Sequence, residues 1–111
     1  MKYHHLGIPT TEAHPDEVYH PHLKMYTRGF EESEFGIEWM RFAPDCDLPE
    51  LVKTVPHVAF AVDDLEQAIK GRNVIIPSNS PSESVRVAFV EESGVPIEFI
   101  QLGAEETGTD H

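Results

Sequence analysis

Cysteine, basic residues and long apolar runs are all scarce in this chain of 111 residues. The single cysteine, Cys46, has no partner within the chain, which argues against a disulfide-stabilised domain. Lys and Arg number 8 against 20 Asp and Glu, and the formal net charge at pH 7 is −12. A surface of this sign repels the phosphate backbone of a nucleic acid. We therefore expect neither a disulfide framework nor a nucleic-acid partner.

The apolar runs are too short for a membrane-spanning helix. The longest, such as residues 57–62 and 95–100, fall far below the roughly 20 residues that a bilayer span requires. The first five residues lack the basic start and the long apolar stretch of a secretory signal. With 40% hydrophobic and 25% charged residues, the composition is that of an ordinary globular protein. We expect one compact domain over residues 1–111, located in the cytoplasm and not bound to a membrane.

The second half of the chain has the clearer pattern of secondary structure. Residues 56–62 are rich in branched and aromatic side chains, as in a buried strand. A helix is expected after this strand, with Asp63 as N-cap and Glu66 completing an acidic capping box. Further strands are expected at residues 73–76, 85–91 and 95–102, with the Pro- and Ser-rich residues 77–84 as a loop. This pattern predicts a β-α-β-β-β module over about residues 55–103, followed by a frayed tail at 104–111.

The first half repeats this plan with one element reduced, over about residues 1–43. Strands are expected at residues 3–8, 23–28 and 35–42. Residues 10–22 contain Pro15 and Pro21 and have little helical periodicity, so the helix of this module is expected to be shortened or missing. Residues 44–54, which are rich in proline and acidic residues, are the expected linker.

The repeat is plainest when each half is aligned on a histidine. The motif HLGI at residues 5–8 corresponds to HVAF at residues 57–60, and each has a small residue two positions after the histidine. The triplet IEW at residues 37–39 corresponds to IEF at residues 97–99. The separation from histidine to glutamate is 33 residues in the first half and 41 in the second. This difference is expected if the first half has lost about two turns of helix.

Each half therefore places one histidine and one glutamate in strands whose other residues are mostly apolar. Burying an isolated carboxylate costs several kcal/mol or forces it to take up a proton, so Glu38 and Glu98 need partners. The strand face that carries His57 is lined by small residues, which leaves room for a cavity, and the face of His5 is similar. Two neutral imidazoles and two carboxylates that converge there would bind one divalent ion, such as Zn, Ni, Co, Mn or Fe.

In these motifs the sequence resembles the vicinal-oxygen-chelate superfamily, to which glyoxalases and bleomycin-resistance proteins belong. The resemblance covers nearly the whole chain and rests on residues 5–8, on residues 57–65, and on residues 86–90 followed by 94–99. It implies an α+β fold in which two βαβββ-type modules form one cupped mixed sheet. Carried over position by position, the metal ligands of the family fall on His5, Glu38, His57 and Glu98.

The resemblance also implies a function. The expected activity is that of a metal-dependent lyase, isomerase or epimerase, which moves a proton beside a carbonyl of a small substrate through a metal-stabilised enediolate. A glutamate would be both ligand and base, because an imidazole bound to metal has no lone pair left for a proton. Both Glu38 and Glu98 are candidates, and Glu98 is favoured because its module is the better preserved.

Two other functions remain open at this point. One is a binding protein of the bleomycin-resistance type, which uses the cup to sequester a small molecule without a metal. The other is a ring-cleaving dioxygenase, although those relatives are much longer and usually place only three protein ligands on iron. The complete set of two histidines and two glutamates favours the metal-dependent enzyme.

A second copy of the chain is the expected protein partner. A module without its helix leaves sheet surface that a neighbouring copy could cover, which predicts a homodimer. The resemblance points the same way, because the cup is often completed across the dimer in this family.

Four other residues have simpler interpretations. His4 should point away from the face of His5 in a strand and is expected at the surface or a sheet edge. His20 and His22 flank a proline in a polar stretch, which favours a solvated loop over a small metal clip. Cys46 lies between two aspartates, and this negative charge disfavours a thiolate nucleophile.

Overall fold

The computed structural model describes residues 1–103, so the predicted tail at 104–111 lies outside the described residues. The first module contains the strands β1 (Lys2–Pro9), β2 (Val18–His20), β3 (Met25–Arg28) and β4 (Ile37–Phe42). The second contains β5 (His57–Ala61), α2 (Leu65–Ile69), β6 (Asn73–Ser82), β7 (Val85–Glu92) and β8 (Val95–Leu102). A short helix, α1 (Glu50–Thr54), lies between them in the sequence.

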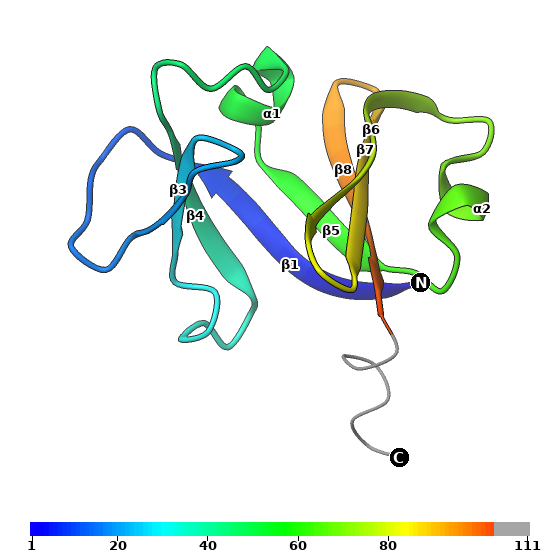
Figure 1. Ribbon diagram of the computed structural model, residues 1–111, viewed down its shortest axis with the longest axis horizontal. Coiled ribbons are helices and arrows are strands. Elements are labelled where there is room, and N and C mark those ends of the chain that lie inside the picture. The colour runs from blue at the N-terminus through cyan, green and yellow to red at the C-terminus, as the bar shows by residue number, and fades with distance from the viewer. Residues whose placement is uncertain (104–111) are drawn as a thin grey trace.

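The eight strands within residues 1–103 belong to one sheet, in the order β2-β3-β4-β1-β5-β8-β7-β6. In Figure 1 the strands of the two modules stand as opposite walls, and β1 and β5 cross between them, so that the sheet forms a cup. The predicted α+β fold with a cupped mixed sheet is confirmed. No helix within residues 1–103 is long and apolar enough to cross a membrane.

The two modules meet along β1 and β5, which pair antiparallel. On the outer side of this pair, β1 runs parallel to β4, and β5 runs parallel to β8. Each module therefore has the same strand order counted outward from the central pair. The repeated histidine motifs lie side by side in this pair, with His5 opposite Ala59 and Gly7 opposite His57. Each histidine thus faces the small residue of the other motif.

The outer face of module 2 is covered by α2 (Figure 1). Leu65, the first residue of the helix, is fully buried in a cluster with Ala88, Val90 and Phe99 from β7 and β8. Burying a side chain of this size contributes about 1.5–3 kcal/mol, because its apolar surface leaves water. This cluster is the main apolar core behind the sheet.

The start of α2 differs from the prediction by one residue. The N-cap is Asp64, whose side chain accepts a hydrogen bond from the Gln67 backbone N–H at 3.2 Å. The predicted cap at Asp63 is therefore wrong. The backbone N–H of Leu65 donates to the side-chain oxygen of Gln101 on β8 at 2.7 Å. This tertiary hydrogen bond holds the first turn of the helix against the sheet. It could not be predicted from the sequence near the helix, because its acceptor lies on β8.

Module 1 has no helix between β1 and β2 within the described residues, as predicted. Its outer face carries a layer of polar and aromatic side chains instead. Arg41 donates two hydrogen bonds to the carboxylate of Glu17, both at 2.8 Å, and its guanidinium lies 4.0 Å from the ring centre of Tyr26. Tyr26 in turn packs against Tyr19, with ring centres 4.7 Å apart. We call these four residues the outer layer of module 1.

Two segments predicted as irregular contain regular structure. The predicted linker at 44–54 includes α1, where Val52 is buried. The predicted loop at 77–84 is wrong for most of its length, because β6 continues to Ser82. Proline is tolerated there because β6 is an edge strand and needs no partner on its outer side. The pairing of β6 with β7 shifts register three times, so this edge is irregular.

Candidate metal centre

The sheet register explains how side chains from separate strands can meet. His5 on β1 and Glu98 on β8 both lie opposite Ala59 on the intervening strand β5. Side chains of neighbouring strands in register point to the same face of a sheet, and the methyl group of alanine is too short to separate its neighbours. His5 and Glu98 therefore meet above Ala59, where His5 Nε2 lies 3.3 Å from Glu98 Oε1.

A second row has the same construction. Glu38 on β4 and His57 on β5 both lie opposite Gly7 on β1. A Cβ added to Gly7 would overlap the His57 ring, so only glycine leaves room for the imidazole in this position. The small residue that the sequence repeats two positions after each histidine thus has a physical role. It forms the floor on which the histidine of the other module lies.

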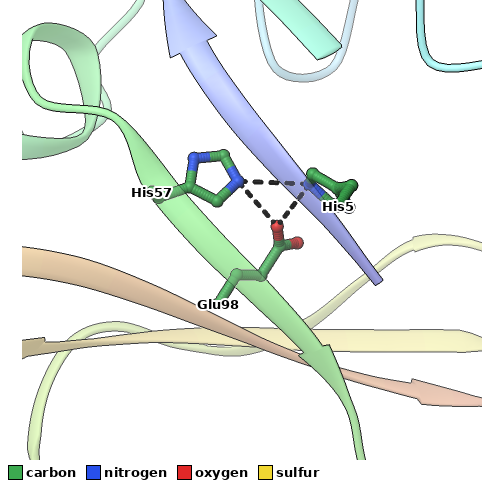
Figure 2. A group of neighbouring side chains, drawn as sticks. All are labelled: His5, His57 and Glu98. Atoms are coloured by element: carbon green, nitrogen blue, oxygen red, sulfur yellow. Dashed lines mark hydrogen bonds and ion pairs between the residues drawn. The ribbon is translucent and has the colours of Figure 1, made fainter. Parts of the chain in front are cut away.

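Three of the four predicted ligands converge on one point, as Figure 2 shows. His57 Nε2 lies 3.2 Å from His5 Nε2 and 3.1 Å from Glu98 Oε1. A zinc ion bound to nitrogen and oxygen at about 2.0–2.1 Å in tetrahedral geometry separates its ligand atoms by about 3.3 Å. Two imidazoles and a carboxylate are also donors that divalent first-row metals accept. The three residues therefore fit a metal ion in both spacing and chemistry.

Glu38 lies beside this group. Its Oε1 is 3.7 Å from His5 Nε2, but it is not one of the three residues whose ligand atoms all lie within 4.8 Å of one another. Its side chain is 25% exposed, against 12% for Glu98. The fourth predicted ligand thus faces the same space from one side and has a looser contact with the cluster.

Burial and mutual charge shift the pKa values of the cluster. Burial alone would raise the pKa of Glu98, but hydrogen bonds and charge from His5 and His57 lower it to about 2. Burial alone would lower the pKa of His5, but Glu98 and Glu38 raise it above its ordinary value. Burial raises the pKa of Glu38, and the charge of His5 offsets this only in part. A metal ion that binds through His5 Nε2 would have to displace any proton on that nitrogen.

His57 is the most enclosed member of the cluster. Its side chain is 2% exposed, and its ring packs edge-on against Phe89 with ring centres 5.0 Å apart. Among the described residues, no hydrogen-bond partner reaches its second nitrogen, Nδ1. The orientation of this ring is therefore set by packing against Gly7 and Phe89.

His4 does not occupy the surface position that strand alternation predicts. The pairing of β1 with β5 shifts register between Tyr3 and His5, so His4 is the extra residue of a β-bulge. Its side chain is half-buried, and its Nδ1 lies 2.8 Å from Nδ1 of His5. The prediction failed because a bulge changes the direction of a side chain and has no signature in this sequence.

The cluster lines a cavity of about 340 Å³ whose walls include residues of both modules. Most of the lining is apolar, and it includes Val52 of α1 within the predicted linker. Its polar residues include Thr27, Asn79, Ser82 and His20. A cavity of this size with a mostly apolar lining is typical of a small-molecule site.

Several of these lining residues were missed in the sequence. His20 was predicted in a solvated loop, but it ends β2, and its Nε2 lies 2.7 Å from Thr27 Oγ1. Asn79 and Ser82 belong to the part of β6 that was predicted as a loop. Strands of three residues, or strands with prolines and register shifts, are too short or too irregular for an alternating pattern to reveal them.

The fold is similar to that in the crystal structure of methylmalonyl-CoA epimerase from Mycobacterium tuberculosis. The TM-score is 0.62, and the match covers 96% of this chain and 91% of that one. The two sequences are 14% identical, so the likeness shows the fold alone. No family model and no curated protein sequence matches the chain. The likeness over nearly the whole length agrees with the fold that the resemblance to vicinal-oxygen-chelate proteins implies.

Proposed function

We propose that this protein is a metal-dependent enzyme of the glyoxalase type, a lyase, isomerase or epimerase that moves a proton beside a carbonyl of a small substrate. The observation that carries the proposal is the convergence of His5, His57 and Glu98 in the wall of the cavity. An epimerase with a similar fold supports this class of activity. The metal is a divalent ion such as Zn, Ni, Co, Mn or Fe.

His5, His57 and Glu98 would hold the ion. Glu38 would be the fourth ligand, a role supported by the 3.7 Å between its Oε1 and His5 Nε2. A divalent ion bound there would polarise two neighbouring oxygens of a substrate and favour loss of the proton beside the carbonyl. The lining of the cavity is mostly apolar, so electrostatic interactions within the cluster would be stronger there than in bulk water. The two histidines, being neutral ligands, leave the glutamates as the groups that can move a proton.

The geometry favours Glu38 as the base, whereas the sequence alone favoured Glu98. Glu98 Oε1 is in contact with both histidines, at 3.1 and 3.3 Å, so its carboxylate is committed to the cluster. Glu38 makes one longer contact, at 3.7 Å, and its side chain is the more exposed to the cavity. A carboxylate with fewer partners can receive a proton and rotate with less loss of bonding.

The metal site is tested by elemental analysis of protein purified without chelators or nickel resin. We expect about one divalent ion per chain in the wild type and a large loss in His57→Ala, because this substitution removes a ligand at the centre of the group. His14→Ala is the matched control, because His14 contacts Asp16 in an exposed segment and does not line the cavity. Equal metal content in the wild type and His57→Ala would contradict the proposed site.

The proton transfer is tested by deuterium exchange at the carbon beside a carbonyl, with hemithioacetals and 2-substituted acyl thioesters as substrates. Glu38→Gln should keep most of the metal and lose about 10²- to 10⁴-fold in exchange rate, as expected for loss of a general base. Glu98→Gln should lose metal affinity first. If the metal-loaded wild type exchanges no such proton and instead binds an aromatic ligand tightly, the binding-protein function replaces the enzyme.

We also propose that the protein is a cytoplasmic homodimer. The exposed large apolar side chains lie mainly in module 1, which lacks the covering helix, and they include Tyr3, Val18, Tyr19 and Phe35. The single cysteine is free and buried, which fits a reducing compartment. Light scattering at micromolar concentration should give twice the chain mass of 12.5 kDa. A clean monomer with a full complement of metal would contradict the dimer and leave the site intact, because the three converging ligands come from one chain.

A further inference from the structure

The bulge in β1 places two consecutive histidines beside the cluster. In a regular strand His4 and His5 would point to opposite faces, but the shift of register between Tyr3 and His5 removes this alternation. The rings of His4 and His5 lie edge-on to each other, with centres 5.0 Å apart and planes at 76°. The contact between them joins Nδ1 of one ring to Nδ1 of the other at 2.8 Å.

Phe30 holds both rings in place. The His4 ring is stacked on Phe30, with centres 5.3 Å apart and planes at 8°. The His5 ring meets the same phenyl group edge-on, with centres 5.8 Å apart. His4 is thus stacked on Phe30 by its face while its Nδ1 contacts Nδ1 of His5.

The position of the protons follows from which nitrogen faces the cluster. His5 Nε2 lies 3.2 Å from His57 Nε2, so Nε2 is the atom that must offer its lone pair to an ion. A neutral imidazole has one N–H and one lone pair, so the proton of His5 is then on Nδ1. Within residues 1–103, the hydrogen-bond partner of His5 Nδ1 is the Nδ1 of His4, which must accept. A hydrogen bond of this kind fixes both the tautomer and the ring orientation of a ligand.

The other histidine of the cluster has no such support. His57 also turns Nε2 to the group, but among the described residues its Nδ1 has no hydrogen-bond partner. Its ring is held instead by the floor at Gly7 and by Phe89. The two histidines are thus positioned by different means, one by a hydrogen bond and the other by packing.

We propose that His4 is a positioning residue for the metal ligand His5, accepting the His5 Nδ1–H so that Nε2 is free to bind the ion. The proposal rests on the proposed metal site and extends it by one residue. It predicts that the acceptor on His4 matters for metal affinity and that the imidazole ring as such does not.

Two substitutions separate the acceptor from the ring. His4→Phe keeps a flat ring that can stack on Phe30 and removes the acceptor. His4→Asn removes the ring and keeps an acceptor, because the amide oxygen of asparagine lies at the same distance along the side chain as Nδ1 of histidine. Competition with a chromophoric chelator for zinc measures the affinity of each variant. We expect His4→Phe to bind zinc about 10- to 100-fold more weakly than the wild type and His4→Asn to recover most of the loss.

A second readout follows the proton itself. In zinc-loaded protein labelled with 15N-histidine, NMR should show a protonated, exchange-protected Nδ1 on His5 in the wild type and in His4→Asn. The protection should be lost in His4→Phe, a change that altered packing alone does not predict. Thermal unfolding of the metal-free variants controls for stability. If His4→Phe does not fold, the protonation of His5 Nδ1 in the zinc-loaded wild type tests the proposal by itself.

The outcomes distinguish this proposal from the proposed function. Zinc affinity in His4→Phe equal to that of the wild type, or an unprotonated His5 Nδ1 in the zinc-loaded wild type, would overturn the role of His4 and leave the metal site standing. Failure of the wild type to bind zinc, cobalt, nickel, manganese or iron would overturn both. A loss in His4→Phe that His4→Asn does not recover would also count against the acceptor role.

Discussion

The two modules share one strand order, but their outer faces are stabilised in different ways. Module 2 covers its sheet with α2 and buries Leu65 in an apolar cluster. Module 1 has no helix in this position within residues 1–103 and carries the outer layer, in which Arg41 joins Glu17 to Tyr26. The inner faces, by contrast, are built alike, because each contributes one histidine and one glutamate to the same cavity. The shared site constrains the side chains of the inner faces. The outer faces do not contribute to the site, so a helix covers one and a layer of polar and aromatic side chains covers the other.

The central pair of strands contains a smaller difference of the same kind. His5 lies opposite Ala59, and His57 lies opposite Gly7. The missing methyl group at Gly7 allows the His57 ring to lie directly on the backbone of β1. A pseudo-symmetric repeat can therefore place equivalent ligands in unequal surroundings, and substitutions at equivalent positions should have unequal effects.

The largest effect is expected from breaking the cover of module 2. Leu65→Ala should lower the free energy of unfolding by about 2–5 kcal/mol, because it leaves a cavity in the apolar cluster. Tyr19→Ala in the outer layer of module 1 is the matched change, and it should cost clearly less because Tyr19 is 44% exposed. Chemical denaturation of the metal-free protein measures both. Equal losses would mean that the outer layer stabilises module 1 as strongly as the helix stabilises module 2.

An intermediate effect is expected at the floor of the site. Gly7→Ala should cost about 1–3 kcal/mol of stability through overpacking and should also weaken zinc binding, because the new methyl group displaces the His57 ring. Ala59→Gly, the equivalent change under His5, should cost about 0.5–1 kcal/mol through the backbone and leave zinc affinity nearly unchanged. Denaturation and zinc titration of both variants test the contrast. Retention of full zinc affinity by Gly7→Ala would show that the cluster adapts.

The smallest effect is expected in acid, from the outer layer of module 1. Hydrogen bonds from Arg41 hold the pKa of Glu17 below its ordinary value of 4.5 in the folded protein. A carboxyl group with a lowered folded pKa stabilises the fold above its unfolded pKa and loses that contribution as the pH falls below it. Glu17→Gln should therefore reduce stability at pH 7 and flatten its decline between pH 5 and pH 3. An unchanged slope over this range, measured by denaturation, would show that the ion pair contributes nothing to acid sensitivity.

Much of the fold could be read from local patterns. The last strand was predicted at residues 95–102 and is β8 with the same bounds, because it is a mostly apolar run that follows the turn signal of Ser93 and Gly94. The missing helix of module 1 followed from two prolines in residues 10–22. What failed depended on contacts between distant segments. Proline marks a loop in most contexts, and only the edge position of β6 makes it compatible with a strand there.

The sequence also predicted part of the candidate site. His5, His57 and Glu98 were identified from a repeat and are brought together in the structure. His4 and His20 were assigned to the surface and to a loop, because one depends on a bulge and the other on a three-residue strand. Both features arise from strand pairing, which local periodicity does not encode.

By itself the sequence determined the composition of the cup: a repeated histidine, a small residue two positions later and a glutamate near the end of each module. These features can be read locally, because the alternation of side chains along a strand determines which neighbouring residues share a face. Only the tertiary structure decided that the two halves of the cluster meet within one chain, and that Glu98 lies closer to the histidines than Glu38 does. The reason is that the register of β1 on β5 sets which side chains share a row, and register comes from long-range pairing of strands about 50 residues apart in the sequence.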